Sequence, residues 1–162
     1  MSYSDFGFIA IIAVGAYFYA VVTAVVASGA YFGLLRFTSL SRRKAARAVA
    51  AGVGAFRAAV VGYGWLALGT EPAVFVGVTV AVVTLVTNVI PLGVGYLVLS
   101  RVVDSDAPLT HTVVGWSPSL VAPLVVAYLF GLPSPPAAWA VLAVPVVGPT
   151  VIGYAVHRVR SR

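Results

Sequence analysis

Arg57 is the residue whose type and position point most directly to chemistry. It lies near the middle of a long apolar run, and none of the four acidic residues of the chain is expected at its depth. A guanidinium at the centre of a bilayer costs about 2.5–3.5 kcal/mol on insertion scales, so it must find acceptors. Without a carboxylate, Arg57 could bind an anion, line a water-filled cavity, or meet a carboxylate of another protein.

The run that follows offers partners for this charge. If the two runs form an antiparallel hairpin about a turn near Glu71 and Pro72, Arg57 and Asn88 lie at the same depth. The predicted polar network or solute site comprises Arg57, Asn88, Thr84, Thr23 and the carbonyl that Pro91 leaves without an amide partner. The alternative is a network of arginine, asparagine and carbonyl groups that fixes helix register and binds nothing.

These residues belong to a chain built almost entirely of apolar runs. Of its 162 residues, 61% are hydrophobic and 9% charged, and the mean hydropathy is +1.05, which excludes an ordinary soluble globule. About 20 apolar residues cross a bilayer. The sequence therefore predicts an all-α, multi-pass protein of the cell membrane, with one domain over residues 1–162 and five transmembrane helices at about 6–35, 48–68, 73–99, 113–132 and 137–156.

The basic residues indicate the orientation of this bundle. Apart from Arg57, they follow the first, third and fifth runs, and five crossings would place these residues on one side. By the positive-inside rule, the N-terminus is predicted outside and the C-terminus in the cytoplasm. The net charge of +6 is thus explained by topology, and no nucleic-acid partner is expected.

One interhelical segment is strongly basic. Ser41 is a predicted helix cap, and it is followed by Arg42, Arg43, Lys44 and Arg47. Such a cluster next to a membrane span can contact anionic lipid headgroups. Alternatively, it serves only as the topology signal.

Other candidate sites are weak. The chain has no cysteine. His111 and His157 both lie near the basic ends of their runs, without the spacing of a metal site, and Asp104 and Asp106 lack further oxygen ligands. We therefore expect no catalytic residue, no metal and no cofactor.

Small residues recur at helical spacing on the second and third runs. Gly54 is expected to face Pro91, and Gly64 to face Ala81, in one close-packed seam. Similar proline, glycine and tyrosine spacings also suggest a weak parallel repeat of the hairpins 48–99 and 113–156.

Two functions fit this sequence. The first is a non-catalytic accessory or structural subunit that associates, through Ala/Gly-rich helix faces, with itself or with a larger membrane complex. The second is an oligomeric transporter or channel for a small solute or anion that uses Arg57. The surroundings of Arg57 distinguish the two functions. A dry helix contact closed by Asn88 favours the subunit, and an open, water-filled pocket with unpaired hydrogen-bond donors favours transport.

Overall fold

The chain is all-helical over residues 3–103, 107–130 and 135–161, which a computed structural model describes. The pair Asp104 and Asp106 lies outside these residues. The elements, in chain order, are α1 (Tyr3–Phe37), α2 (Arg42–Leu68), α3 (Thr70–Thr84), the π-helix η1 (Leu85–Val89), α4 (Ile90–Val102), α5 (Pro108–Phe130) and α6 (Pro135–Arg160).

Local chemistry sets the ends of α2. Ser41 caps its first turn, as predicted, and the serine hydroxyl accepts from the backbone N–H of Lys44 at 3.4 Å. Gly69 ends the helix with a φ of 82°, a left-handed value that glycine adopts without steric cost. The hairpin turn is therefore at Gly69, slightly before the predicted position at Glu71 and Pro72.

The third run is one continuous helical rod in three parts. Pro91 has no N–H to offer the residue four positions earlier, Thr87, so a regular α-helix cannot continue unchanged through this point. The five residues of η1 form a wider π turn immediately before it, and α4 continues beyond. The run is thus a single rod with irregular backbone near its middle.

Four helical segments are long and apolar enough to cross a membrane: Val14–Phe37, Arg42–Ala67, Gly77–Val102 and Pro108–Val126. α6 is also helical over 26 residues, but the side chains of its first turns are not described. The count of five crossings, the orientation, the single domain and the internal repeat remain predictions.

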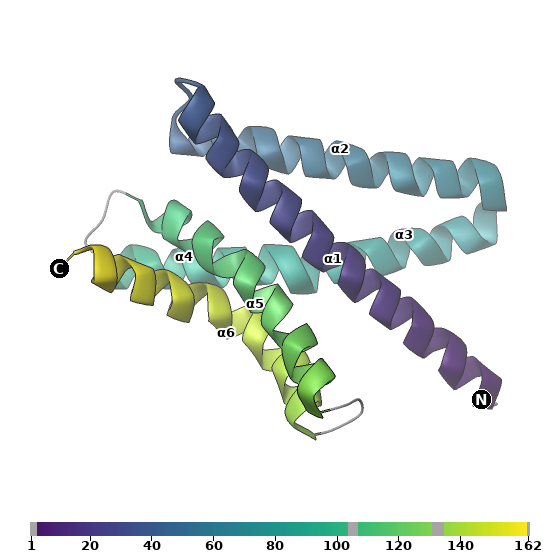
Figure 1. The fold of residues 1–162 in the computed structure, drawn as a ribbon. Coiled ribbons are helices and arrows are strands. Elements are labelled where there is room, and N and C mark those ends of the chain that lie inside the picture. Colours follow the sequence, from purple (N-terminus) through teal and green to yellow (C-terminus); the bar gives the residue numbers. More distant parts are fainter. Residues whose placement is uncertain (1–2, 104–106, 131–134, 162) are drawn as a thin grey trace.

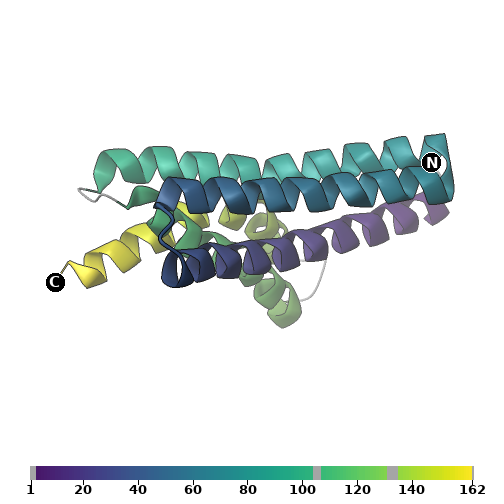
Figure 2. The same ribbon diagram turned by 90° about the horizontal axis from the view of Figure 1, so that it is seen from above.

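The helices gather their basic residues at one end of the molecule. Figure 1 shows that α1, α4 and α6 end, and α2 and α5 begin, on the same side; we call this the basic end. The side that carries Gly69 is the turn end. From the basic end, the α5–α6 pair diverges from the α2–α3 pair, and α1 diverges from α2 and crosses α3 (Figure 1). Figure 2 shows the same helices from above, and α1 contacts both α2 and α5.

The main buried cluster forms where α1 crosses α5. It comprises Val21, Ala24, Ala27, Trp116 and Leu120, with Val49, Val53 and Leu92 packed against it. Four polar contacts among the described residues join the same two helices: Tyr17 to the Leu120 carbonyl at 2.9 Å, Ser28 to Ser117 at 2.6 Å, Ser117 to the Ala24 carbonyl at 3.4 Å, and Tyr31 to Thr110 at 3.0 Å. Apolar packing and hydrogen bonds thus both hold α1 against α5.

The close-packed glycine seam lies between α5 and α6, and the seam predicted between α2 and α3 is wrong. A Cβ on Gly115 would lie 2.5 Å from the Pro149 carbonyl oxygen, and a Cβ on Gly153 would lie 2.6 Å from that of His111. By contrast, a Cβ on Gly54 or Gly64 would meet nothing within 4 Å. On α3 a Cβ on Gly77 would meet only Val61 at 3.6 Å, an ordinary contact, whereas the small-residue faces of α5 and α6 meet closely, with Gly95 of α4 packed against Thr112 and Pro149.

We expect Gly115→Ala to lower the free energy of unfolding by about 1–3 kcal/mol, because the new methyl group meets backbone that cannot move aside. The control Gly52→Ala, whose Cβ meets nothing, is expected to be neutral or stabilising, because alanine favours helix. Equilibrium unfolding by SDS titration measures both. Equal effects would contradict the placement of the seam.

Candidate functional site

Arg57 of α2 and Asn88 of η1 are hydrogen-bonded inside the bundle. They are 8% and 6% exposed. The hydrogen-bonding pattern assigns the Asn88 amide with its oxygen toward the guanidinium, where it accepts from Arg57 Nη1 at 3.2 Å and also from Nη2. The proximity expected from the antiparallel hairpin is therefore present.

The direction of side chains in helices explains how these residues meet. Every Cα–Cβ bond leans toward the N-terminus of its own helix. The two rods are antiparallel, so Arg57 leans toward the basic end, and Asn88 leans toward the turn end. The predicted equal depth is therefore wrong: with the turn at Gly69, Arg57 lies nearer to the turn end than Asn88, and the lean of the two side chains brings them into contact.

A backbone carbonyl extends this pair into a network across three helices. With the same orientation, Asn88 Nδ2 donates to the Thr87 carbonyl at 3.1 Å, and the indole Nε1 of Trp116 donates to that oxygen at 3.0 Å. This carbonyl is the one that Pro91 leaves without an amide partner. It was expected to accept from Arg57 directly, but Asn88 and Trp116 occupy it instead.

The two predicted threonine partners bond elsewhere. The Thr84 hydroxyl donates to the Val80 carbonyl, and the Thr23 hydroxyl donates to the Tyr19 carbonyl at 2.7 Å. A threonine in a helix readily forms this bond to the preceding turn. The structure therefore gives both hydroxyl protons partners within their own helices.

Tyr19 of α1 is the neighbour of Arg57 that the sequence did not reveal. The guanidinium carbon lies 5.9 Å from the centroid of the Tyr19 ring, a cation–π contact, and that ring stacks on Phe56 at 6.3 Å. Among the described residues, neither the Tyr19 hydroxyl nor Arg57 Nε has a hydrogen-bond partner, although both are buried. Two buried polar atoms of the site, the Tyr19 hydroxyl oxygen and Arg57 Nε, are thus able to form further hydrogen bonds.

Arg57 borders two hollows. The first, which we call the inner cavity, has a volume of about 430 Å³ and extends along α2 from Ala46 to Arg57, with Asn88, Leu92 and Val113 also in its wall. The second, which we call the α2–α3 groove, has a volume of about 660 Å³ and extends from Arg57 toward the turn end. The guanidinium is therefore a polar group between two mainly apolar spaces.

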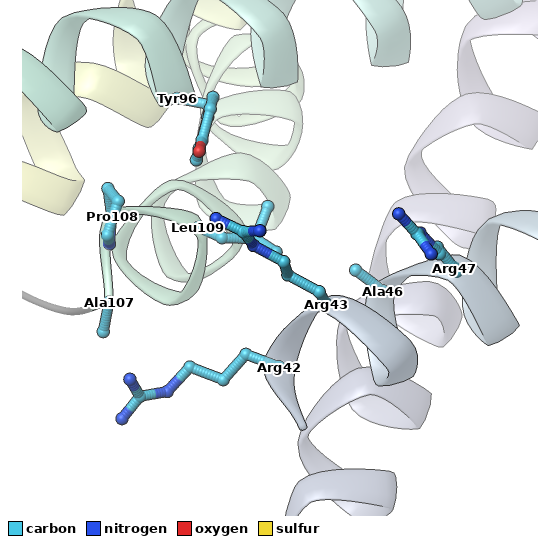
Figure 3. A pocket seen from close by; sticks show the side chains of 8 residues that line it. All are labelled: Arg42, Arg43, Ala46, Arg47, Tyr96, Ala107, Pro108 and Leu109. Carbon is cyan, nitrogen blue, oxygen red and sulfur yellow. The ribbon is translucent and has the colours of Figure 1, made fainter. Parts of the chain in front are cut away.

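Three of the four predicted lipid-contact residues surround a hollow at the basic end. Arg42, Arg43 and Arg47 line it with Tyr96 of α4 and the start of α5, in a volume of about 290 Å³ (Figure 3). Lys44 is not part of its wall. We call this hollow the arginine pocket.

The two histidines are neighbours, which their sequence positions did not indicate. Their ring centroids lie 5.2 Å apart in an edge-to-face arrangement, and His111 Nδ1 donates to the Ala107 carbonyl at 2.9 Å. Within the described ranges, no group of three His, Cys, Asp or Glu residues could hold a metal ion. The pair therefore packs the basic ends of α5 and α6 together.

Comparisons with protein-family models, with curated proteins and with solved structures found no match.

We expect Asn88→Asp to leave the free energy of unfolding close to its present value, because the gain of charge-assisted hydrogen bonds from Arg57 offsets the loss of the amide N–H bond to the Thr87 carbonyl. The control Thr84→Val removes a hydroxyl bonded only within its helix among the described contacts, and it is expected to change stability by less than about 0.5 kcal/mol. SDS titration measures both. A larger loss for Thr84→Val than for Asn88→Asp would contradict the assigned network.

Proposed function

We propose that this chain is a small non-catalytic subunit of the cell membrane that self-associates through the α2–α3 groove. In this proposal the protein crosses the membrane five times as a single domain, with its N-terminus outside and the basic end in the cytoplasm. Self-association would provide a packing partner for the outer face of the α2–α3 hairpin, which has none among the described residues of one copy.

The observation that carries the proposal is an apolar groove lined by small residues and open to the outside of the bundle. Ala58, Gly62, Gly77 and Ala81 line it, and a Cβ on Gly62 would meet nothing within 4 Å. Membrane helices associate mainly where small residues let backbones approach closely. The hairpin of α5 and α6 uses this mode inside the chain, whereas the groove has the same residue types and no occupant among the described residues.

Burial supports this assignment. Within Arg42–Ala67, only 11% of the most apolar stretch is buried inside the chain. In Pro108–Val126 the buried share of the corresponding stretch is 44%. α2 thus contributes most of its surface to the outside of the bundle. Two Arg57 guanidinium groups would repel each other at close range, so the contact between copies is expected to be displaced toward Gly62 and Gly77, at the turn end.

Single-cysteine cross-linking tests the contact, because the chain has no cysteine and any disulfide must join two copies. In proteoliposomes treated with a membrane-permeant oxidant, Gly62→Cys is expected to form a cross-linked dimer. Gly52→Cys is the matched control, since it is a glycine of the same helix that lies outside the groove. Equal or absent cross-linking at the two positions would refute self-association through the groove.

Transport of a small anion is the second candidate, and the position of Arg57 between the two hollows favours it. The buried Nε has no partner among the described residues and could bind a passing anion. Proteoliposomes loaded with a chloride-sensitive dye are then expected to show a chloride flux that Arg57→Leu reduces at least tenfold. A flux no higher than that of protein-free liposomes would eliminate this candidate.

A further inference from the structure

We propose that the arginine pocket and the inner cavity together form a binding site for one anionic membrane lipid, with the phosphate headgroup in the pocket and an acyl chain in the cavity. The two hollows share wall residues: Ala46 and Leu109 belong to both. One continuous surface therefore passes from a strongly basic region to an apolar one, which is the chemistry of a lipid molecule.

The arginine pocket lies at the correct depth for a headgroup. α2 has 27 residues, or about 40 Å of helix rise, which exceeds the roughly 30 Å of bilayer hydrocarbon. Its first turns, which carry Arg42, Arg43 and Arg47, are therefore expected in the headgroup region. Figure 3 shows these side chains on one wall of the pocket, with Tyr96 and the first residues of α5 opposite them.

The charges of the pocket suit a phosphate. Arginine guanidinium groups bind phosphate through paired N–H donors. The N-terminus of α5, at Pro108 and Leu109, adds the positive end of a helix dipole to the same wall. The three arginines of the described wall make it electrostatically complementary to an anionic headgroup.

The inner cavity suits an acyl chain. From Ala46 to Val53 its wall is apolar, and the nearby polar atoms of Tyr31 and Trp116 are already bonded, to Thr110 and to the Thr87 carbonyl. Ala50 belongs to the wall and is also exposed, so the cavity opens to the side of the bundle. A chain could therefore enter laterally from the bilayer.

The other hollows do not share this character. The α2–α3 groove does not include the arginine cluster, and a further surface hollow at Leu35–Arg43 does not share walls with the inner cavity. The joined pocket and cavity thus combine a wall of three arginines with a long apolar wall, which neither of these two hollows does. The cavity adjoins the groove of the proposed self-association at Arg57, Thr84 and Val89, but Arg43, Arg47 and Ala50, which test the lipid site, lie outside the groove, and Gly62, which tests the groove, lies outside the lipid site, so either assignment can fail without the other.

Native mass spectrometry of the detergent-purified full chain tests the lipid site. The probes are phosphatidylglycerol, phosphatidylcholine with the same acyl chains, and glycerol phosphate as a headgroup without a tail. We expect one tightly retained phosphatidylglycerol, with phosphatidylcholine at least tenfold weaker and glycerol phosphate not retained. Retention of glycerol phosphate alone would show a free-phosphate site, and equal retention of the two lipids would show ordinary surface lipid; either result overturns the proposal.

Two pairs of variants locate the headgroup and the chain. Arg43→Gln with Arg47→Gln is expected to weaken phosphatidylglycerol binding about 25-fold, at about fivefold per charge, whereas the control Arg158→Gln with Arg160→Gln removes two exposed charges of α6 and changes binding less than twofold. If the two double variants weaken phosphatidylglycerol binding equally, the binding depends on general surface charge and not on the arginine pocket, and the proposed headgroup site is wrong.

Ala50→Phe fills the cavity without changing charge and is expected to weaken binding at least tenfold. The control Ala51→Phe places the same bulk at an exposed position outside the cavity wall. Helical circular dichroism of each variant confirms folding before binding is measured. If folded Ala50→Phe retains phosphatidylglycerol as well as Ala51→Phe does, the chain does not lie in the cavity and the proposal is wrong.

Discussion

The burial of the Arg57 guanidinium is the constraint on which the arrangement of α2, η1 and α5 depends. A charge at this depth requires acceptors, and the described chain supplies the Asn88 amide oxygen and the face of the Tyr19 ring. Asn88 in turn donates to the Thr87 carbonyl. Because Pro91 removes the usual amide partner of that carbonyl, the oxygen is free to accept from other helices. The proline thus provides the acceptor that joins the Asn88 amide to the rest of the bundle.

Trp116 connects two parts of the molecule that pack in different ways. α5 and α6 are held by glycines against backbone, while a Cβ on any glycine of α2 would meet nothing within 4 Å. The indole of Trp116 belongs to the buried cluster of α1 and α5, and it reaches the π turn through the Thr87 carbonyl. A rigid pair of helices therefore anchors a hairpin with exposed faces. Such a hairpin can offer surfaces to lipid or to another copy without disturbing the core.

The positions of the helices could be predicted closely, because each is an apolar run bounded by polar or turn residues. The antiparallel hairpin also predicted that Arg57 and Asn88 approach each other, although it placed them at equal depth and the direction of their side chains is what brings them into contact. The packing partners of the small residues could not be predicted. A stripe of Gly and Ala shows that a helix face can pack closely, but it does not show which helix packs against that face. Gly54 and Gly115 look alike in sequence, yet only Gly115 lies against a neighbouring backbone.

The partners missed by sequence reasoning come from distant helices. Tyr19 and Trp116 lie far from Arg57 along the chain, and aromatic residues are common throughout membrane helices for other reasons. The Thr87 carbonyl, four residues before Pro91, was part of the predicted network, but its bonds from Asn88 and Trp116 were not predicted. The proximity of His111 and His157 depends on how α5 packs against α6, which no local pattern specifies.

A double-mutant cycle between Arg57→Leu and Asn88→Leu tests most directly whether the buried charge is held by this network. Each single change leaves the other polar group buried without its main partner, so each is expected to be costly, whereas the double change removes both groups. SDS titration should give a coupling free energy of about 1.5–3 kcal/mol, the range for a hydrogen bond to a charged group. Effects that add to within about 0.5 kcal/mol would show that the two residues act independently and would contradict this account.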